Sequence, residues 1–402
     1  MRTVGLFFMG LGFLGFFWTL FGSMLVSFVF GSLKNLLFKS PQSKSIENRE
    51  IIKFDILIAA FNEEGTIAQT LKSFEECTKI LGRNKEKILV RAVVGLDHCT
   101  DSTLSIVQKF KKTSNFEVSY LENDETRGKW FVLKKLIRAS NADWVALTDC
   151  GSIWNSELLL KVAPQLRDQE LVCIAPSYLP TGAKFLESLY WRLEQFVRYF
   201  ENVGGGPIMV HGISVFYKRA ALIDVLDQLG ETHWFNDDVV IPLSLRLNNP
   251  HKRIHYLAEL EKKTWVYDIG VVTKASVELT RRKRILIGNL QIIKHIILPR
   301  FQFFSLASWS SLRLVFKVLW AYWVSFFAIG LLIILETTTL LSDFLSHQSF
   351  SKMIVELLFV FTLFIMVKKS NYIHRLFMAY LSGLWIFKGW KALDNLKKIS
   401  WS

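Results

Sequence analysis

The sequence predicts an α/β protein with a mostly parallel sheet and helices on both faces, together with transmembrane helices at both ends. Two observations lead to this prediction. Between residues 51 and 285, short apolar runs alternate with amphipathic stretches, which is typical of strands that are buried on both faces and joined by helices. At the two ends of the chain, long uncharged runs are flanked by basic residues, as membrane segments are.

The distribution of charge separates the middle of the chain from its ends. The 402 residues carry a net charge of +14, but residues 51–280 hold 28 basic and 29 acidic side chains, so the excess lies at the ends. A nucleic-acid-binding protein is expected to carry its basic residues on a folded polar domain. We therefore exclude nucleic acid as a partner and expect the lipid bilayer in its place.

The N-terminal part predicts a membrane anchor. Residues 3–33 contain no charged side chain, and this length exceeds the roughly 20 residues that span a bilayer. No small-residue cleavage site ends the run, so we expect a retained anchor at 1–33 and a linker at 34–50. Basic residues follow the run, which places the next domain in the cytoplasm of a multi-pass plasma-membrane protein.

The C-terminal part predicts two or three further hydrophobic helices within residues 314–402, after an interfacial segment at 291–313. Residues 318–335 form an uncharged run, and residues 353–367 form a shorter apolar run that contains Glu356. Residues 376–390 are apolar but are followed by lysines, so this segment spans against the charge rule, re-enters, or lies in the interface.

In the middle of the chain, four strands and three helices are expected from the alternation of patterns. The expected strands are 54–61, 90–96, 116–122 and 142–149, and the expected helices are 65–81, 101–112 and 128–140. Ligands of such sheets bind beyond the carboxyl ends of the strands, so residues at those ends are candidates for a site.

Acidic side chains stand at three of these strand ends, namely Glu63, Asp97 and Asp149. Crowded carboxylates are costly unless they hold a cation or bind a polar ligand. For Asp101, which precedes Ser102 and Thr103, capping of the following helix is the simpler interpretation. The sequence contains neither a dinucleotide-binding glycine motif nor a P-loop, so other groups must hold any phosphates.

Six motifs follow one another along the middle of the chain, namely AAFNEE (59–64), LDHCTDST (96–103), TRGK (126–129), TDCGS (148–152), FNDD (235–238) and RRKR (281–284). Their order and distances resemble those of the membrane-bound glycosyltransferases of family 2, which have a GT-A fold. The resemblance covers about residues 51–290, and no single motif decides it.

The resemblance implies a site for a UDP-sugar donor. Phe61 is expected to pack near the nucleobase, while Glu63 and Asp97 bind the uracil and the ribose. Lys129 is expected to reach the diphosphate. Carboxylates suit the first roles because they accept hydrogen bonds from an imide N–H and from hydroxyl groups.

The resemblance also implies a metal ion and a catalytic base. Asp149 matches the first carboxylate of the family's D-x-D motif, which binds Mg²⁺ or Mn²⁺ on the diphosphate, but Gly151 stands at the second position. Asp238 matches the base, with Asp237 as its support. An N-cap role for this pair is the alternative interpretation.

Arg281 and Arg284 lie where the family has Q-x-x-R-W, a motif that covers the donor diphosphate at the membrane surface. Arg284 matches the arginine of this motif, whereas Arg281 replaces the glutamine and Ile285 replaces the tryptophan. That tryptophan helps to hold the acceptor in polymerases, so its loss does not favour processive synthesis of long chains.

The expected function is therefore inverting transfer of a sugar to a polysaccharide, an oligosaccharide or a lipid-linked acceptor, with partner subunits possible. A catalytically inactive membrane partner of another glycan synthase is the alternative, because Gly151 and Ile285 depart from the motifs. The four cysteines show no metal-binding spacing and are expected to be reduced thiols.

Overall fold

The computed structural model describes residues 51–84, 86–182, 185–202, 205–257, 264–269 and 275–300, together with Val29. The predicted membrane segments therefore lie outside the described residues, apart from Val29, and so does the linker 34–50. Within the part of the chain that is described, no helix combines the length and the apolar composition that a membrane span requires.

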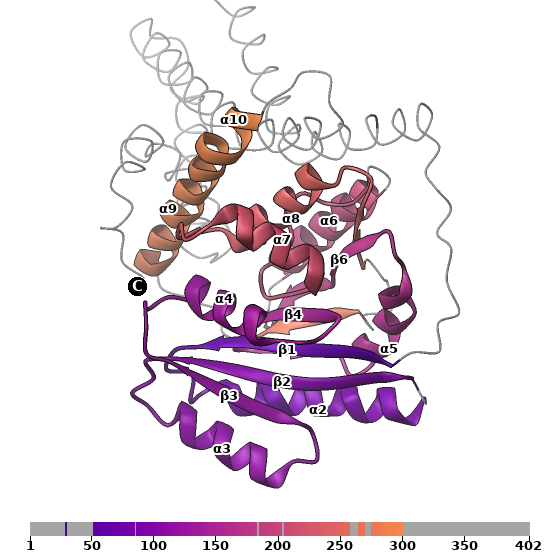
Figure 1. The fold of residues 1–402 in the computed structure, drawn as a ribbon, viewed down its shortest axis with the longest axis vertical. Helices are drawn as coiled ribbons and strands as arrows, with labels where there is room; N and C mark the ends of the chain where they lie inside the picture. Colours follow the sequence, from indigo (N-terminus) through magenta and orange to yellow (C-terminus); the bar gives the residue numbers. More distant parts are fainter. Residues whose placement is uncertain are drawn as a thin grey trace, which may run out of the picture. The chain divides into compact units, whose positions relative to one another are not determined.

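A seven-stranded sheet forms the centre of residues 51–271, which we call the main unit (Figure 1). All of its strands run parallel except β8, which is antiparallel to both of its neighbours. The strand order is β3 (Val118–Asn123), β2 (Ile88–Asp97), β1 (Ile52–Ala60), β4 (Trp144–Asp149), β8 (Ser214–Lys218), β6 (Leu171–Ala175) and β9 (Arg253–Tyr256).

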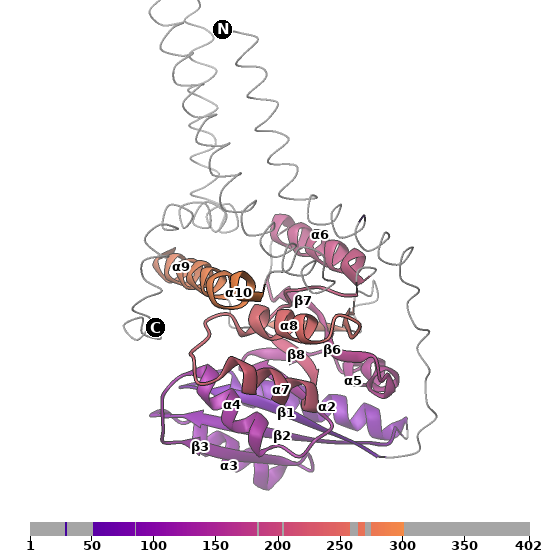
Figure 2. The same ribbon diagram turned by 45° about the horizontal axis from the view of Figure 1, so that its top comes forward.

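Helices cover both faces of this sheet (Figures 1 and 2). On one face lie α2 (Ile67–Arg83), α3 (Thr103–Thr113) and α5 (Leu158–Val162). On the other lie α4 (Lys129–Ala139) and α7 (Arg219–Leu229), and α8 (Asp237–Asn248) packs against α7. The α/β architecture predicted from the sequence is confirmed, with four strands and three helices close to their expected positions.

A second, three-stranded sheet has the order β5 (Ser152–Trp154), β10 (Trp265–Asp268) and β7 (Ser177–Pro180). The short helix η1 (Ala163–Arg167) follows α5, and α6 (Phe185–Glu201) follows β7. The helices α9 (Ala275–Ile292), η3 (Ile293–Ile297) and α10 (Leu298–Arg300) end the described chain. Residues 272–295, which include α9, belong to a separate unit from residues 51–271.

The core forms because alternate residues of the central strands point to opposite faces. Phe54 and Ile56 of β1 are fully buried and belong to the apolar cluster under α2. On the opposite face, α4 approaches β2 so closely that a Cβ atom at Gly95 would lie 2.4 Å from a methyl carbon of Val132. Glycine is therefore the residue that permits this packing distance, because it has no Cβ atom.

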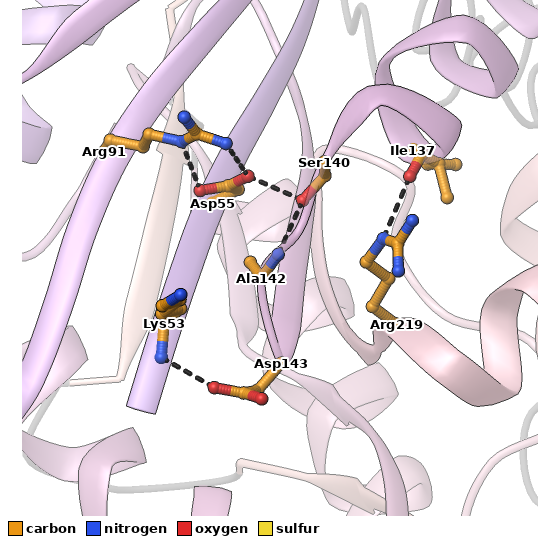
Figure 3. Close-up of polar contacts among 8 residues, drawn as sticks. All are labelled: Lys53, Asp55, Arg91, Ile137, Ser140, Ala142, Asp143 and Arg219. Atoms are coloured by element: carbon orange, nitrogen blue, oxygen red, sulfur yellow. Dashed lines mark hydrogen bonds and ion pairs between the residues drawn. The ribbon is translucent and has the colours of Figure 1, made fainter. Parts of the chain in front are cut away.

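One charged side chain is buried between the sheet and the C-terminal end of α4 (Figure 3). Asp55 of β1 is only 4% exposed and accepts two hydrogen bonds from the guanidinium group of Arg91, at 2.7 and 2.9 Å. The hydroxyl group of Ser140, just after α4, donates to the same carboxylate at 2.5 Å. The carboxylate thus joins β1, β2 and the end of α4, and each of its oxygens is satisfied.

We expect Asp55→Ala to lower the free energy of unfolding by about 2 kcal/mol, because it leaves the donors of Ser140 and Arg91 without their acceptor. Asp143→Ala is the matched control, since Asp143 is exposed and its carboxylate accepts a hydrogen bond from the backbone N–H of Lys53 in the same region. Thermal unfolding of the two purified variants measures the difference. Equal stability of the two variants would contradict a structural role for Asp55.

Candidate active site

The ends of three parallel strands and the starts of two helices meet in one region of the main unit. β1 ends at Ala60, β2 at Asp97 and β4 at Asp149, and because the three strands are parallel their carboxyl ends share one edge of the sheet. Lys129, the first residue of α4, contacts both the end of β4 and the first turn of α8. The predicted candidates Lys129, Asp149 and Asp237 are thus brought together.

The centre of this region is an ammonium group between two carboxylates. The Nζ atom of Lys129 lies 2.7 Å from Oδ1 of Asp149 and 3.2 Å from Oδ2 of Asp237. Burial by itself would lower the pKa of Lys129, but the negative charges of Asp149 and Asp237 outweigh it and raise the pKa well above its usual range. Lys129 is therefore a permanent cation in this structure.

Burial and neighbouring charges also act on the pKa of Asp149, each with the opposite sign to its effect on Lys129. Loss of surrounding solvent raises the pKa of Asp149, and the nearby charge of Lys129 counteracts this effect. The carboxylates of Asp237 and Asp268 add to the increase. The half-buried Asp149 thus lies in a strongly negative region in which Lys129 is its close counterion.

Asp237 and Asp238 occupy the first turn of α8, after Asn236 as the N-cap residue, and no capping hydrogen bond from the N-cap side chain is formed. Acidic side chains are favoured in a first turn by the helix dipole. The N-cap position is held by Asn236, while both aspartates stand in the first turn, and the catalytic role of the pair stays a prediction. Both side chains are half-buried.

The backbone of Asp238 is held by an unusual contact that follows from the sequence. Pro242, four residues later in α8, has no N–H group, so it cannot donate to the carbonyl oxygen of Asp238. The backbone N–H of Val210 donates to that oxygen instead, at 3.0 Å. The loop before β8 therefore lies close to Asp238, and a Cβ atom at Gly212 would be 3.1 Å from its Cβ atom.

Asp97 has structural partners that its sequence position does not reveal. It is 4% exposed, and its oxygens accept from the backbone N–H of Gly128 and from the side-chain amide of Asn123, both at 2.9 Å. The Asn123 amide also donates to the carbonyl oxygen of Thr126. Asp97 thus fixes the loop that leads into Lys129, and its predicted contact with uracil and ribose stays a prediction.

Phe61 and Glu63 follow β1, as predicted. Phe61 is 38% exposed, and the guanidinium carbon of Arg127 lies 4.1 Å from the centre of its ring. Glu63 accepts a hydrogen bond from the hydroxyl group of Thr66 at 2.5 Å, and burial raises its pKa, with Asp149 among the charges that add to the effect. Their roles in nucleotide binding remain predictions.

Asp101 stabilises the start of α3, as expected, although Ser102 holds the N-cap position. Its Oδ1 atom accepts from the backbone N–H and the hydroxyl group of Thr103, at the start of α3. Its Oδ2 atom accepts from the backbone N–H of Glu64. These contacts join the two loops that follow β1 and β2.

Arg281 and Arg284 lie in α9, which belongs to the separate unit, and their predicted contact with a donor diphosphate stays a prediction. Sequence reasoning missed Arg127, although it belongs to the TRGK motif, because nothing in the sequence indicates that its side chain stacks on Phe61. It also missed Asn123, whose partner Asp97 lies 26 residues away in the chain. All four cysteines are free thiols.

The predicted Mg²⁺ or Mn²⁺ site fits the described residues poorly. Gly151 offers no side-chain oxygen, and the space between Asp149 and Asp237 contains the ammonium group of Lys129. Among the described residues, no group of three or more His, Cys, Asp and Glu side chains is arranged to hold a metal ion. Asp149 would be the carboxylate ligand of such an ion, and the metal requirement stays a prediction.

Comparison with known proteins agrees with this geometry. Residues 55–226 match the family model of glycosyl transferase family 2. This stretch contains Lys129 and Asp149 and covers most of the strand ends that form the site. This part of the chain is therefore similar to glycosyl transferase family 2 domains. No curated protein sequence matches the chain significantly.

A solved structure shows the same fold. A mannosyltransferase from Pyrobaculum calidifontis, in complex with GDP-mannose and Mn²⁺, is 16% identical with a TM-score of 0.63, over 94% of this chain and 99% of that one. At this identity the likeness shows the fold, which is GT-A. A weaker likeness is TarS from S. aureus, with 16% identity and a TM-score of 0.42 over 67% of this chain and 72% of that one. Another is glucosyl-3-phosphoglycerate synthase from Mycobacterium tuberculosis, in complex with Mn²⁺, UDP and phosphoglyceric acid, with 15% identity and a TM-score of 0.39 over 58% of this chain and 76% of that one.

We expect Asp97→Ala to weaken UDP binding about 10-fold and to lower the thermal stability of the ligand-free protein, because the loop before Lys129 loses its anchor. Asp124→Ala is the matched control, since Asp124 is an exposed carboxylate in the same loop. Calorimetric titration with UDP and thermal unfolding measure the two effects. Weaker binding with unchanged ligand-free stability would instead indicate that Asp97 contacts only the nucleotide.

Proposed function

We propose that this chain is an inverting glycosyltransferase that moves a sugar from a UDP-sugar to a glycan or a lipid-linked acceptor at the cytoplasmic face of the plasma membrane. The observation that carries the proposal is the contact of Lys129 with Asp149 and Asp237, beside Asp238. A cation for a diphosphate and a carboxylate for an acceptor hydroxyl thus lie together at the ligand-binding edge of a GT-A sheet.

The proposed reaction is a single in-line displacement. Asp238 takes the proton of the acceptor hydroxyl, and the oxygen of that hydroxyl forms a bond to the anomeric carbon of the donor sugar. The bond from that carbon to the diphosphate breaks, its electron pair goes to the phosphate oxygen, and UDP leaves. The configuration at the anomeric carbon is inverted because attack and departure occur on opposite sides.

The chain's own residues have distinct roles in this reaction. Lys129 lies at the start of α4, where its positive charge and that of the helix dipole favour a phosphate group. This charge stabilises the leaving diphosphate as negative charge develops. Asp238 is held by the Val210 contact, which fixes the helix turn that carries the base.

Two parts of the proposal rest on sequence features. The membrane location and cytoplasmic orientation are supported by the uncharged runs and the basic residues at both ends of the chain. The choice of UDP is supported by the resemblance at Phe61, Glu63 and Asp97. A GDP-sugar is a natural comparison in the assay, since the Pyrobaculum enzyme of the same fold was solved with GDP-mannose.

A catalytically inactive membrane partner of another glycan synthase is the second candidate function. Gly151 and Ile285 favour it, because both replace residues that the resemblance associates with activity. The ion-paired arrangement of Lys129, Asp149 and Asp237 argues against it, because a binding partner needs no general base beside a phosphate-directed cation. Nucleotide binding is common to both candidates, whereas turnover is not.

We expect the full-length protein in lipid nanodiscs to release UDP from one member of a panel of UDP-sugars when lipid extract or oligosaccharide is supplied. Asp238→Asn should lower this rate about 1,000-fold, within the range of a lost general base. Asp224→Asn, which changes an exposed carboxylate on α7, is the control and should leave the rate unchanged. GDP-mannose is included in the panel.

Near-normal turnover of Asp238→Asn would show that Asp238 is not the base. Absence of turnover with every donor and acceptor, while UDP still binds, would favour the inactive partner. Release of GDP from GDP-mannose in place of UDP would correct the donor class and leave the transferase activity intact.

A further inference from the structure

A lysine ammonium stands at the place in this site where the resemblance predicts a metal ion. Its nitrogen lies within ion-pairing distance of carboxylates from two different elements, Asp149 at the end of β4 and Asp237 at the start of α8. The second carboxylate that a D-x-D motif would supply is absent, because position 151 is glycine. The presence of the ammonium and the absence of the carboxylate are independent observations that concern the same few atoms.

Gly151 reduces the negative charge available to a divalent ion. A D-x-D motif offers two carboxylates to such an ion, whereas the end of β4 offers only Asp149. Asp149 and the nearby Asp237 both already pair with the ammonium group of Lys129. A divalent ion between these carboxylates would therefore have to displace a cation that is held there by the protein itself.

The ammonium group also has the right hydrogen-bonding capacity. A lysine side chain has three N–H donors. The ion pairs with Asp149 and Asp237 need at most two of them, so at least one N–H can serve a phosphate oxygen. The Lys129 side chain is 22% exposed and that of Asp149 is 41% exposed, so a ligand can approach the pair from solvent.

The position of Lys129 is fixed before any ligand binds. Gly128, directly before it, has a φ angle of 135°, which side chains other than glycine rarely adopt. The N–H group of Gly128 donates to the buried carboxylate of Asp97 at 2.9 Å. A cation that is held in place in this way needs little reorganisation when the diphosphate becomes more negative, which is the condition for effective electrostatic stabilisation.

We propose that Lys129 provides the cation for the leaving diphosphate in this chain and that sugar transfer needs no divalent metal ion. This inference rests on the proposed transferase function. Asp149 is then a positioning residue, because it holds the ammonium group toward the donor and does not itself bind a metal ion.

The first test compares turnover and UDP affinity of the full-length protein in nanodiscs with EDTA, with Mg²⁺ and with Mn²⁺. We expect kcat/KM and the Kd for UDP to differ by less than about 3-fold among the three conditions, since the charge is supplied by the protein. A decrease of more than about 10-fold in EDTA that Mn²⁺ reverses would overturn the proposal. That result would support the metal requirement predicted from the resemblance.

The second test removes the ammonium group. Lys129→Gln should lower kcat/KM about 100-fold in EDTA. Because Asp149 and Asp237 lose their counterion, the variant should also bind Mn²⁺ and regain part of its turnover with it, whereas the parent protein is not stimulated. Lys135→Gln is the matched control, as Lys135 lies on the same helix and pairs with Glu125 at the surface.

Near-normal turnover of Lys129→Gln in EDTA would overturn the proposal. Thermal unfolding of both variants shows whether the loss of activity reflects loss of folding. If Lys129→Gln does not fold, the turnover of the parent protein in EDTA and in Mn²⁺ still decides whether transfer needs a metal ion.

Failure of this inference and failure of the proposed function give different results. If no donor is turned over under any condition, the transferase function is wrong, and the UDP titrations still test the role of Lys129. Equal affinity in EDTA and in Mn²⁺ would support Lys129 as the phosphate-binding cation, whereas binding that needs Mn²⁺ would exclude it.

Discussion

The ion pairs of Lys129 connect the parts of the molecule on which the site depends. Its ammonium group joins the end of β4 to the first turn of α8, although Asp149 and Asp237 are 88 positions apart in the sequence. Without this cation, the carboxylates of Asp149 and Asp237 would repel each other in a region that is already negative because of Asp268 and Glu63. The same charge that stabilises the ligand-free site is the one that a diphosphate would use.

The supports of this lysine are buried polar groups and not only apolar packing. Asp97 holds the preceding loop through Gly128 and Asn123, and Gly95 allows α4 to lie directly on β2. Asp55 fixes the other end of α4 through Ser140. Helix α4 is thus tied to the sheet at both ends by carboxylates, which explains how a flexible side chain such as lysine can present its charge at a defined place.

Much of this organisation follows from local patterns in the sequence, and the rest depends on contacts between distant residues. The strands and helices between residues 52 and 149 were predictable because apolar periodicity is local, and so was the placement of Glu63, Asp97 and Asp149 at strand ends. The antiparallel pairing of β8 with β4 and β6 was not predicted, since it is decided by tertiary packing. The engagement of Asp97 by Gly128, and the contact of Val210 with the carbonyl oxygen that Pro242 leaves without a helical donor, are likewise invisible in any single window of sequence.

The proposed chemistry also gives a reason for the base and the cation to lie so close together. In the transfer step, Asp238 loses its negative charge by taking a proton, while the diphosphate gains one as the bond to the sugar breaks. Negative charge therefore moves from one side of the site to the other while the total stays constant. A cation that contacts Asp237, next to the base, and also faces the phosphate experiences little net change during the reaction. A singly charged lysine is sufficient for this role because the total negative charge around it stays constant. The lysine does not have to neutralise an additional negative charge.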